Sequence, residues 1–227
     1  MEEAAQRREH PSLQRIGGFS DGVFAFAITL LILAIRVPHP DDSDAASGLL
    51  SLLAHQWRSY LAFVMSFVLI GATWANHRVM FAKFERADNT LVWLNLLGLM
   101  VGAAFMPIPT AVLGAWLGSS HYEDQVVAAV FYGLGSTAGV FCFNLVWWYG
   151  AYSAKLTHPE LTAAQRRAHT IAWGAGIPVM GLLTAIAFVN PGVAVAGFVA
   201  VIVAYVLPLA RIIARIGRRW LPSRRGA

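Results

Sequence analysis

Residues 15–33 read RIGGFSDGVFAFAITLLIL, and this stretch decides the fold. No charged residue follows Asp21 within it, and its apolar run is long enough for a helix that crosses a bilayer, which needs about 20 residues. The run is too long for the apolar core of a signal peptide, it carries Asp21 and Thr29, and no small-x-small cleavage site follows it. We therefore predict a retained membrane helix.

Apolar blocks of similar length recur along the rest of the chain. Hydrophobic residues make up 57% of the 227 residues and charged residues only 13%, whereas a soluble domain has about a quarter charged residues. The sequence therefore predicts an all-α integral membrane protein with six transmembrane helices. The six blocks are Gly17–Ile35, Leu49–Ala75, Asn89–Leu117, Val126–Gly150, Ile171–Val189 and Val193–Ile213.

Basic residues orient these segments. Of the 17 Lys and Arg residues, all but Arg36 and Arg58 fall before the first block, in alternate gaps, or in the tail. The positive-inside rule places that side in the cytoplasm, together with both termini. We expect a cytoplasmic segment over residues 1–16, a membrane domain over 17–213 and a basic cytoplasmic tail over 214–227. Anionic lipid headgroups explain that tail better than nucleic acid does, because it adjoins a membrane helix.

The connectors and remaining reactive residues offer little chemistry. Thr162 is expected to start a short cytoplasmic helix over Ala163–Arg167, and the prolines at 107, 109 and 178 are expected to kink their helices. The single cysteine, Cys142, lies inside the fourth block and reads as a buried, inert thiol. The histidines show no metal-ligand spacing, so we predict no metal site and no cofactor.

Polar residues at the start of the first block form the main candidate cluster. We predict that Arg15, Ser20 and Asp21 meet His77, with Asn76 beside it, because the first helix enters the membrane where the second leaves it. A carboxylate at a membrane helix normally has a partner or faces water. In the alternative interpretation, Ser20 or Asp21 caps the start of the helix.

Gly18 to Gly22 also match G-x-S-x-G, the nucleophile elbow of hydrolases. That motif requires a sharp turn between a strand and a helix, above a sheet. An intramembrane triad of Ser20, His77 and Asp21 is therefore the weakest alternative, and we predict no enzymatic activity.

One face of the first helix carries an apolar stripe. Gly22, Phe26, Leu30 and Leu33 follow helical spacing, and Thr29 borders them. Such a stripe most often faces lipid or another helix, and Thr29 could simply bond back to the carbonyl of Ala25. Periodicity alone therefore leaves a pore as the less common reading.

A resemblance changes that weighting. Arg15-x-x-x-Phe19-Ser20-Asp21, continuing to Leu33, resembles the first-helix signature of bacterial members of the transmembrane protein 175 family, relatives of the lysosomal potassium channel. Residues 74–78, WANHR, and 105–110, FMPIPT, also resemble this family. The resemblance covers about twenty residues in its specific motif and the whole chain in helix count.

The resemblance implies a potassium-permeable channel of the bacterial inner membrane. Four subunits would place their first helices around a central axis, and Phe26, Leu30 and Leu33 would form apolar constriction rings with Thr29 close by. The motif residues Arg15, Phe19, Ser20 and Asp21 would hold the first helix to the second, at Asn76 and His77. The expected partners are potassium and other monovalent cations, membrane lipids and further copies of the chain, with no nucleic acid.

Two positions depart from the family pattern. Phe26 stands where relatives usually have Ile or Leu, and Ala34 stands where many have an acidic residue, which leaves Arg36 without that counter-charge.

A secondary transporter is the alternative function; it would need broken helices and a charged site at the membrane midplane. The prolines offer breaks, but the sequence places no ionisable residue at mid-membrane depth.

Overall fold

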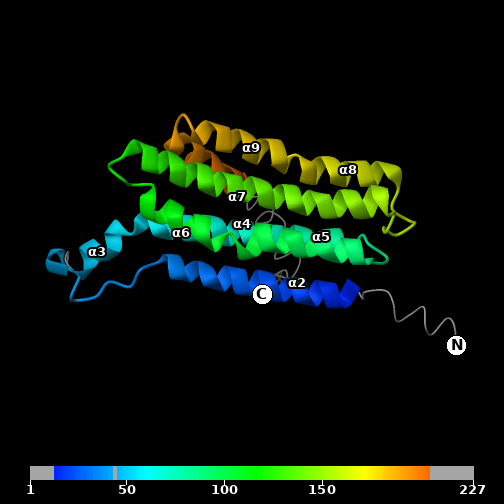
Figure 1. The fold of residues 1–227 in the computed structure, drawn as a ribbon, viewed down its shortest axis with the longest axis horizontal. Coiled ribbons are helices and arrows are strands. Elements are labelled where there is room, and N and C mark those ends of the chain that lie inside the picture. Colours follow the sequence, from blue (N-terminus) through cyan, green and yellow to red (C-terminus); the bar gives the residue numbers. More distant parts are fainter. Residues whose placement is uncertain (1–12, 43–44, 205–227) are drawn as a thin grey trace, which may run out of the picture.

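The computed structural model describes residues 13–42 and 45–204, which form a bundle of long, roughly aligned helices (Figure 1). Within these residues, five helical runs are long and apolar enough to cross a membrane: Leu13–Ala34, Trp57–Phe81, Asn89–Trp116, Tyr122–Ser153 and Ala163–Ala187. They correspond to the first five predicted blocks. Pro191–Ala204 is a shorter apolar helix. The rest of the predicted sixth block and the basic tail lie outside the described residues.

The runs divide into named elements. The first comprises α2 (Leu13–Leu30) and the 3₁₀ turn η1 (Leu31–Ala34), and the short η2 (Ala45–Ser47) and α3 (Leu49–His55) precede α4 (Trp57–Phe81). The third comprises α5 (Asn89–Leu99), η3 (Met100–Ala104) and α6 (Pro107–Trp116), and the fourth comprises α7 (Tyr122–Trp148) and η4 (Tyr149–Ser153). The fifth comprises α8 (Ala163–Gly174) and α9 (Gly176–Ala187).

The fifth run begins earlier than predicted. Thr162 and Gln165 form a capping box in which each side chain accepts from the other residue's backbone N–H, so the helix starts at Ala163. The predicted short cytoplasmic helix over Ala163–Arg167 is thus the first part of the membrane-crossing run, not a separate element. The run is interrupted between α8 and α9, because Pro178 has no N–H to donate to the carbonyl of Gly174.

Prolines also reshape the third run. Pro107 and Pro109 cannot donate to the carbonyls one turn before them, and a π-helical turn, η3, precedes them where a straight helix would otherwise continue. Pro107 then occupies the first position of α6, where a missing N–H costs nothing. The predicted kink is therefore a wider turn followed by a fresh helix start.

The helix α7 lies at the centre of the bundle and packs against α5, η3, α6, α8 and α9. Its backbone closely approaches that of η3, where a Cβ on Gly139 would lie 2.8 Å from the Cα of Gly102. Three hydroxyl groups cross the core nearby: Thr110 Oγ1 lies 2.6 Å from Ser66 Oγ, which lies 3.4 Å from the hydroxyl of Tyr132. Backbone contact and buried polar contacts together fix the third run against its neighbours.

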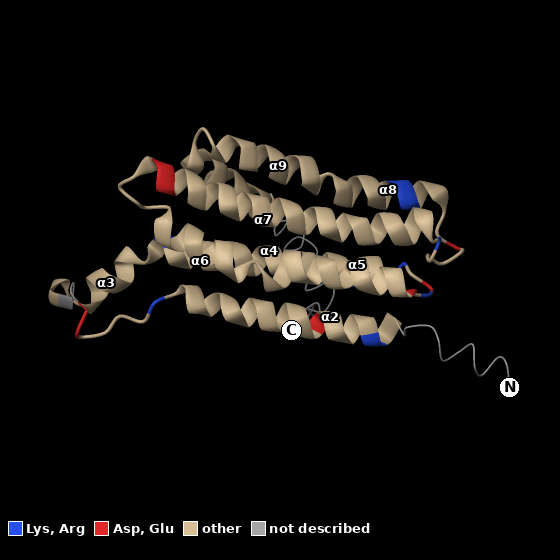
Figure 2. Ribbon diagram, viewed as in Figure 1, with Lys and Arg blue, Asp and Glu red and all other residues tan. Residues whose placement is uncertain are grey.

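Charged side chains gather mainly at the two ends of the bundle, and the helices between them are largely uncharged except on α2 (Figure 2). Water would solvate those ends while lipid contacts the apolar middle. The molecule is accordingly a multi-pass membrane protein.

Candidate functional site

The helix α2 lies at one edge of the bundle and has two distinct faces (Figure 1). Its inner face is buried against α4, α5, η3 and α6 and carries Ile16, Ser20, Phe24 and Ala27. Its outer face exposes 66% of Phe26 and, one turn beyond α2, 77% of Leu33. Large apolar side chains thus line a helix face that no other described part of the chain covers.

A shallow groove of about 600 Å³ follows this outer face. Its walls are small or apolar, and one of them comes from η3 at Ala104. The residues that line the groove are Gly18, Phe19, Gly22, Val23, Phe26, Ala27, Leu30 and Ala104. The predicted stripe of Gly22, Phe26 and Leu30 therefore lies along the groove.

The helical turn becomes tighter just after α2 ends. After Leu30 the chain forms the 3₁₀ turn η1, in which residues three apart are nearly eclipsed, so Leu33 projects above Leu30. Thr29 is exposed beside them, and its hydroxyl donates to the carbonyl of Phe26 at 2.8 Å. The alternative in which it bonds back to Ala25 is thus replaced by a bond to the next residue along. The four predicted pore-lining residues thus occupy adjoining positions on or beside one face.

Ser20 and His77 are joined on the inner face by a residue that the sequence reasoning missed. Asn95 of α5 donates from Nδ2 to Ser20 Oγ at 3.0 Å, and its Oδ1 lies 2.8 Å from Nε2 of His77. All three side chains are buried. The sequence signal for Asn95 is an amide in the apolar interior of the third block, six residues beyond Asn89 at its start. Asn95 ties α2, α4 and α5 together.

Asp21 has a different partner. The indole Nε1–H of Trp74 donates to its carboxylate at 2.7 Å, and the guanidinium of Arg78 lies 5.1 Å from the Trp74 ring. Asp21 is therefore held to α4 from the exposed side of α2. Neither it nor Ser20 caps a helix start, because α2 begins at Leu13.

The other motif residues are spread around this contact. Arg15 and Phe19 lie exposed on α2, while Asn76 faces away from α2, into a cavity beside Asn144 and Trp173. Ser20 donates to the carbonyl of Ile16 at 2.9 Å. The hydroxyl of Ser20 is thus engaged with Ile16 and Asn95, an arrangement unlike a nucleophile activated by His77.

At the other end of α2, Arg36 has a counter-charge despite Ala34. Its guanidinium pairs with Asp42, and its backbone N–H donates to Gln56 Oε1 at 3.1 Å. The backbone N–H of His39 donates to Asp42 at 2.9 Å and lowers the pKa of that carboxyl below its usual value, and the nearby charges of Arg36 and His39 act in the same direction. The departure at Ala34 therefore leaves Arg36 paired within its own loop.

We expect Asn95→Leu to destabilise the protein. Leucine is of similar size but leaves Nε2 of His77 without its partner and removes one of the two partners of Ser20. An unsatisfied buried group costs about 1–3 kcal/mol. The melting temperature of the purified protein should fall clearly. Asn89→Leu, at the exposed start of the same helix, is the matched control and should leave the melting temperature almost unchanged. Equal melting temperatures for the two variants would remove Asn95 from this role.

Comparison with known proteins bears on the same segment. Residues 15–107 match the family model described as Endosomal/lysosomal potassium channel TMEM175. A protein of Streptomyces collinus named as a potassium channel is 43% identical over 178 residues, which cover 78% of this chain and 82% of that relative. A protein of Chamaesiphon minutus, also named as a potassium channel, is 40% identical over 148 residues, covering 65% and 70% of the two chains.

The fold agrees with these matches. The crystal structure titled as a lysosomal potassium-selective channel TMEM175 homolog from Chamaesiphon minutus superposes with a TM-score of 0.76 at 33% sequence identity, over 86% of this chain and 97% of that one. The residues that match the family model begin at Arg15, the first residue of the motif, and include both Asp21 and Asn95. This chain is a member of the TMEM175 family and is similar to its bacterial members.

Proposed function

We propose that this chain is the subunit of a potassium-permeable cation channel and that ions pass along the outer face of α2. The carrying observation is that face itself: Phe26 and Leu33 are among its most exposed side chains. The inner face of the same helix is held by the buried bonds of Ser20, Asn95 and His77. The relatives named as potassium channels support potassium as the permeant ion and a channel in preference to an enzyme.

A pore on this face requires several copies of the chain. One helix cannot enclose a path, so α2 from four subunits, arranged around a common axis, is the assembly we propose. The groove lined by Phe19, Gly22 and Phe26 gives each copy a concave apolar surface that neighbouring copies would line or fill. In a bilayer, lipid tails are as apolar as this face, so association would be favoured by close van der Waals packing of the helices, which small residues such as Gly22 permit.

Within that assembly, Phe26, Leu30 and Leu33 would form apolar rings, with the hydroxyl of Thr29 between them. Hydrophobic constrictions gate by excluding water, and ions must shed part of their hydration to pass. Selectivity of this kind is expected to be looser than that of a filter built from backbone carbonyls. The bulk of Phe26 would make its ring the driest.

We further propose a sixth crossing and an orientation. Val201 and Ile202, near the end of the described helix Pro191–Ala204, line the cavity that also contains Asn144 and Trp173. A sixth crossing over residues 193–213 would complete a membrane domain over 17–213. In this proposal both termini lie in the cytoplasm, which the positive-inside rule supports, and the protein lies in the bacterial inner membrane, which its similarity to bacterial relatives supports. Reporter fusions after Ser120 and His158 should score on opposite sides.

The test of function is purified protein in liposomes under a potassium gradient. We expect potassium efflux, a slower sodium efflux under a sodium gradient, and current steps from single channels in planar bilayers. Current steps distinguish a channel from a secondary transporter, which moves ions by alternating access. Liposomes that contain the protein but release no potassium would contradict the proposal.

A further inference from the structure

A second, more polar cavity lies at the end of the bundle where α4 begins and α6 ends. Its volume is about 580 Å³, and it opens to the surface between these helices and the turn that follows α6. Arg58 is the cation among its lining residues, and none of them is acidic. The lining residues are His55, Gln56, Arg58, Ser59, Gly114, Ala115, Trp116, Gly118, Ser119 and Ser120.

Arg58 is fixed by its surroundings. Its guanidinium lies 5.0 Å from the ring of Trp57, and it packs so closely on Gly118 that a Cβ there would lie 2.4 Å from Cζ. Only glycine at 118 leaves room for the guanidinium in this position. Within residues 13–42 and 45–204, Arg58 makes no ion pair. A preorganised guanidinium that lacks a carboxylate partner is suited to an external anion.

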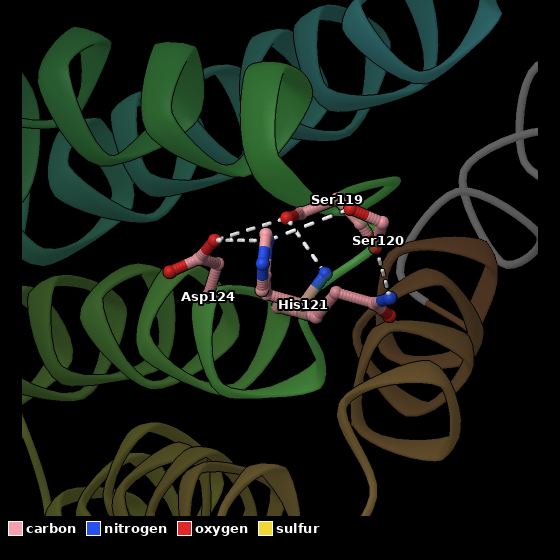
Figure 3. Close-up of polar contacts among 5 residues, drawn as sticks. Ser119, Ser120, His121 and Asp124 are labelled. Carbon is pink, nitrogen blue, oxygen red and sulfur yellow. Dashed lines mark hydrogen bonds and ion pairs between the residues drawn. The ribbon is translucent and has the colours of Figure 1, made fainter.

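The first turn of α7 carries two acidic residues, Glu123 and Asp124, and Asp124 is engaged with the turn that precedes it. Asp124 accepts from Ser119 Oγ at 3.0 Å and lies 3.8 Å from Nδ1 of His121. Figure 3 shows its carboxylate turned toward these two side chains. The backbone N–H of His121 also donates to Ser119 Oγ at 3.1 Å. These contacts hold the turn that forms one wall of the cavity and keep Asp124 engaged.

Aromatic residues indicate the depth of this cavity in the bilayer. Trp57 and Trp116 are 52% and 50% exposed, and Tyr122, at the start of α7, is 54% exposed at the same end. Exposed Trp and Tyr at the ends of membrane helices lie at the level of the lipid headgroups. Arg58 therefore lies at the depth of lipid phosphates.

We propose that this cavity binds the phosphate group of a membrane phospholipid. The guanidinium of Arg58 would pair with two phosphate oxygens, as arginine does with planar or tetrahedral anions. Gln56 offers its amide N–H₂ groups, because its Oε1 already accepts from the backbone of Arg36. A bound lipid would thereby contact the residue that also holds the outer end of the first helix run.

The test uses the full chain in detergent, titrated with phosphatidylglycerol and followed by native mass spectrometry. Arg58→Gln should weaken lipid binding about tenfold, equivalent to about 1.4 kcal/mol, because the variant loses the charge of the phosphate contact. Gly118→Val should weaken it similarly by displacing the guanidinium. Arg86→Gln, the same charge change at an exposed position in the loop between α4 and α5, is the control and should bind as the parent does.

Three results would overturn the proposal. Undiminished lipid binding by Arg58→Gln would remove the site, and equal weakening by Arg86→Gln would make the attraction unspecific. Displacement of the lipid from the parent by excess inorganic phosphate would assign the cavity to free phosphate instead. Size-exclusion profiles identical to that of the parent would confirm that each variant is folded. The proposal is independent of the channel function, since lipid binding is measured without ion flux.

Discussion

Leu33→Asn is expected to increase potassium efflux from liposomes and to reduce the preference for potassium over sodium. Leu33 is 77% exposed on the outer face of the first helix run, and asparagine keeps a similar size while offering hydrogen bonds to water and ions. A wetted ring lowers the barrier that a dry constriction imposes. The measurement is efflux from matched liposomes that contain equal amounts of assembled protein.

Leu31→Asn is the contrasting variant. Leu31 is two residues away and fully buried against the bundle, so a polar side chain there should cost stability and leave the pore unwetted. Flux that is unchanged by Leu33→Asn would argue that this face contacts lipid. Cysteines at 26, 30 and 33 should then react with water-soluble thiol reagents no faster than cysteines at 24, 28 and 31. The chain's own Cys142 is buried, which keeps background labelling low.

Gly139→Ala should have the largest effect on stability. The added Cβ would lie 2.8 Å from the Cα of Gly102, and backbone on both sides cannot move aside as a flexible side chain can. Overpacking of this kind costs about 1–3 kcal/mol or more. Thermal unfolding in detergent should show a marked fall in melting temperature, with α7 and η3 forced apart.

Gly181→Ala provides the matched control, because a Cβ at Gly181 in α9 would meet no atom within 4 Å. Alanine has the higher helix propensity, so this variant should be as stable as the parent or slightly more stable. A melting temperature for Gly139→Ala that equals that of Gly181→Ala would show that α7 and η3 separate without cost.

The sequence predicted the long helices and the exposed face of α2 because both follow from apolar periodicity. Length and composition identified five of the crossings, and the spacing of Phe26, Leu30 and Leu33 placed them on one side. The helix start beside Thr162 was predicted and is confirmed, but the continuity of that helix with the fifth block was missed. The prediction ended the short helix at Arg167 and began the fifth block at Ile171, whereas the helix runs through both without a break until Gly174.

The polar contacts were less predictable. Ser20, Asp21 and His77 could be assigned to one level of the membrane from topology alone, but their partners depend on how α4 and α5 are rotated. Rotation is set by side-chain packing, which periodicity in a uniformly apolar segment does not reveal. Asn95 and Trp74 therefore emerged only from the structure. The π-helical turn was also visible only in the structure, because a proline predicts an interruption of the helix without determining what form it takes.

The π-turn η3 fixes the number of residues between two anchored side chains of the third helical run. Asn95 is anchored to Ser20 and His77 on one side of it, and Thr110 to Ser66 on the other. A π-turn holds one residue more than an α-turn, so deleting one residue from 100–104 would restore a regular helix and rotate everything beyond it by about 100°. Thr110 would swing away from Ser66. Evolution can therefore exchange side chains between these two anchors far more easily than it can change the number of residues that separate them.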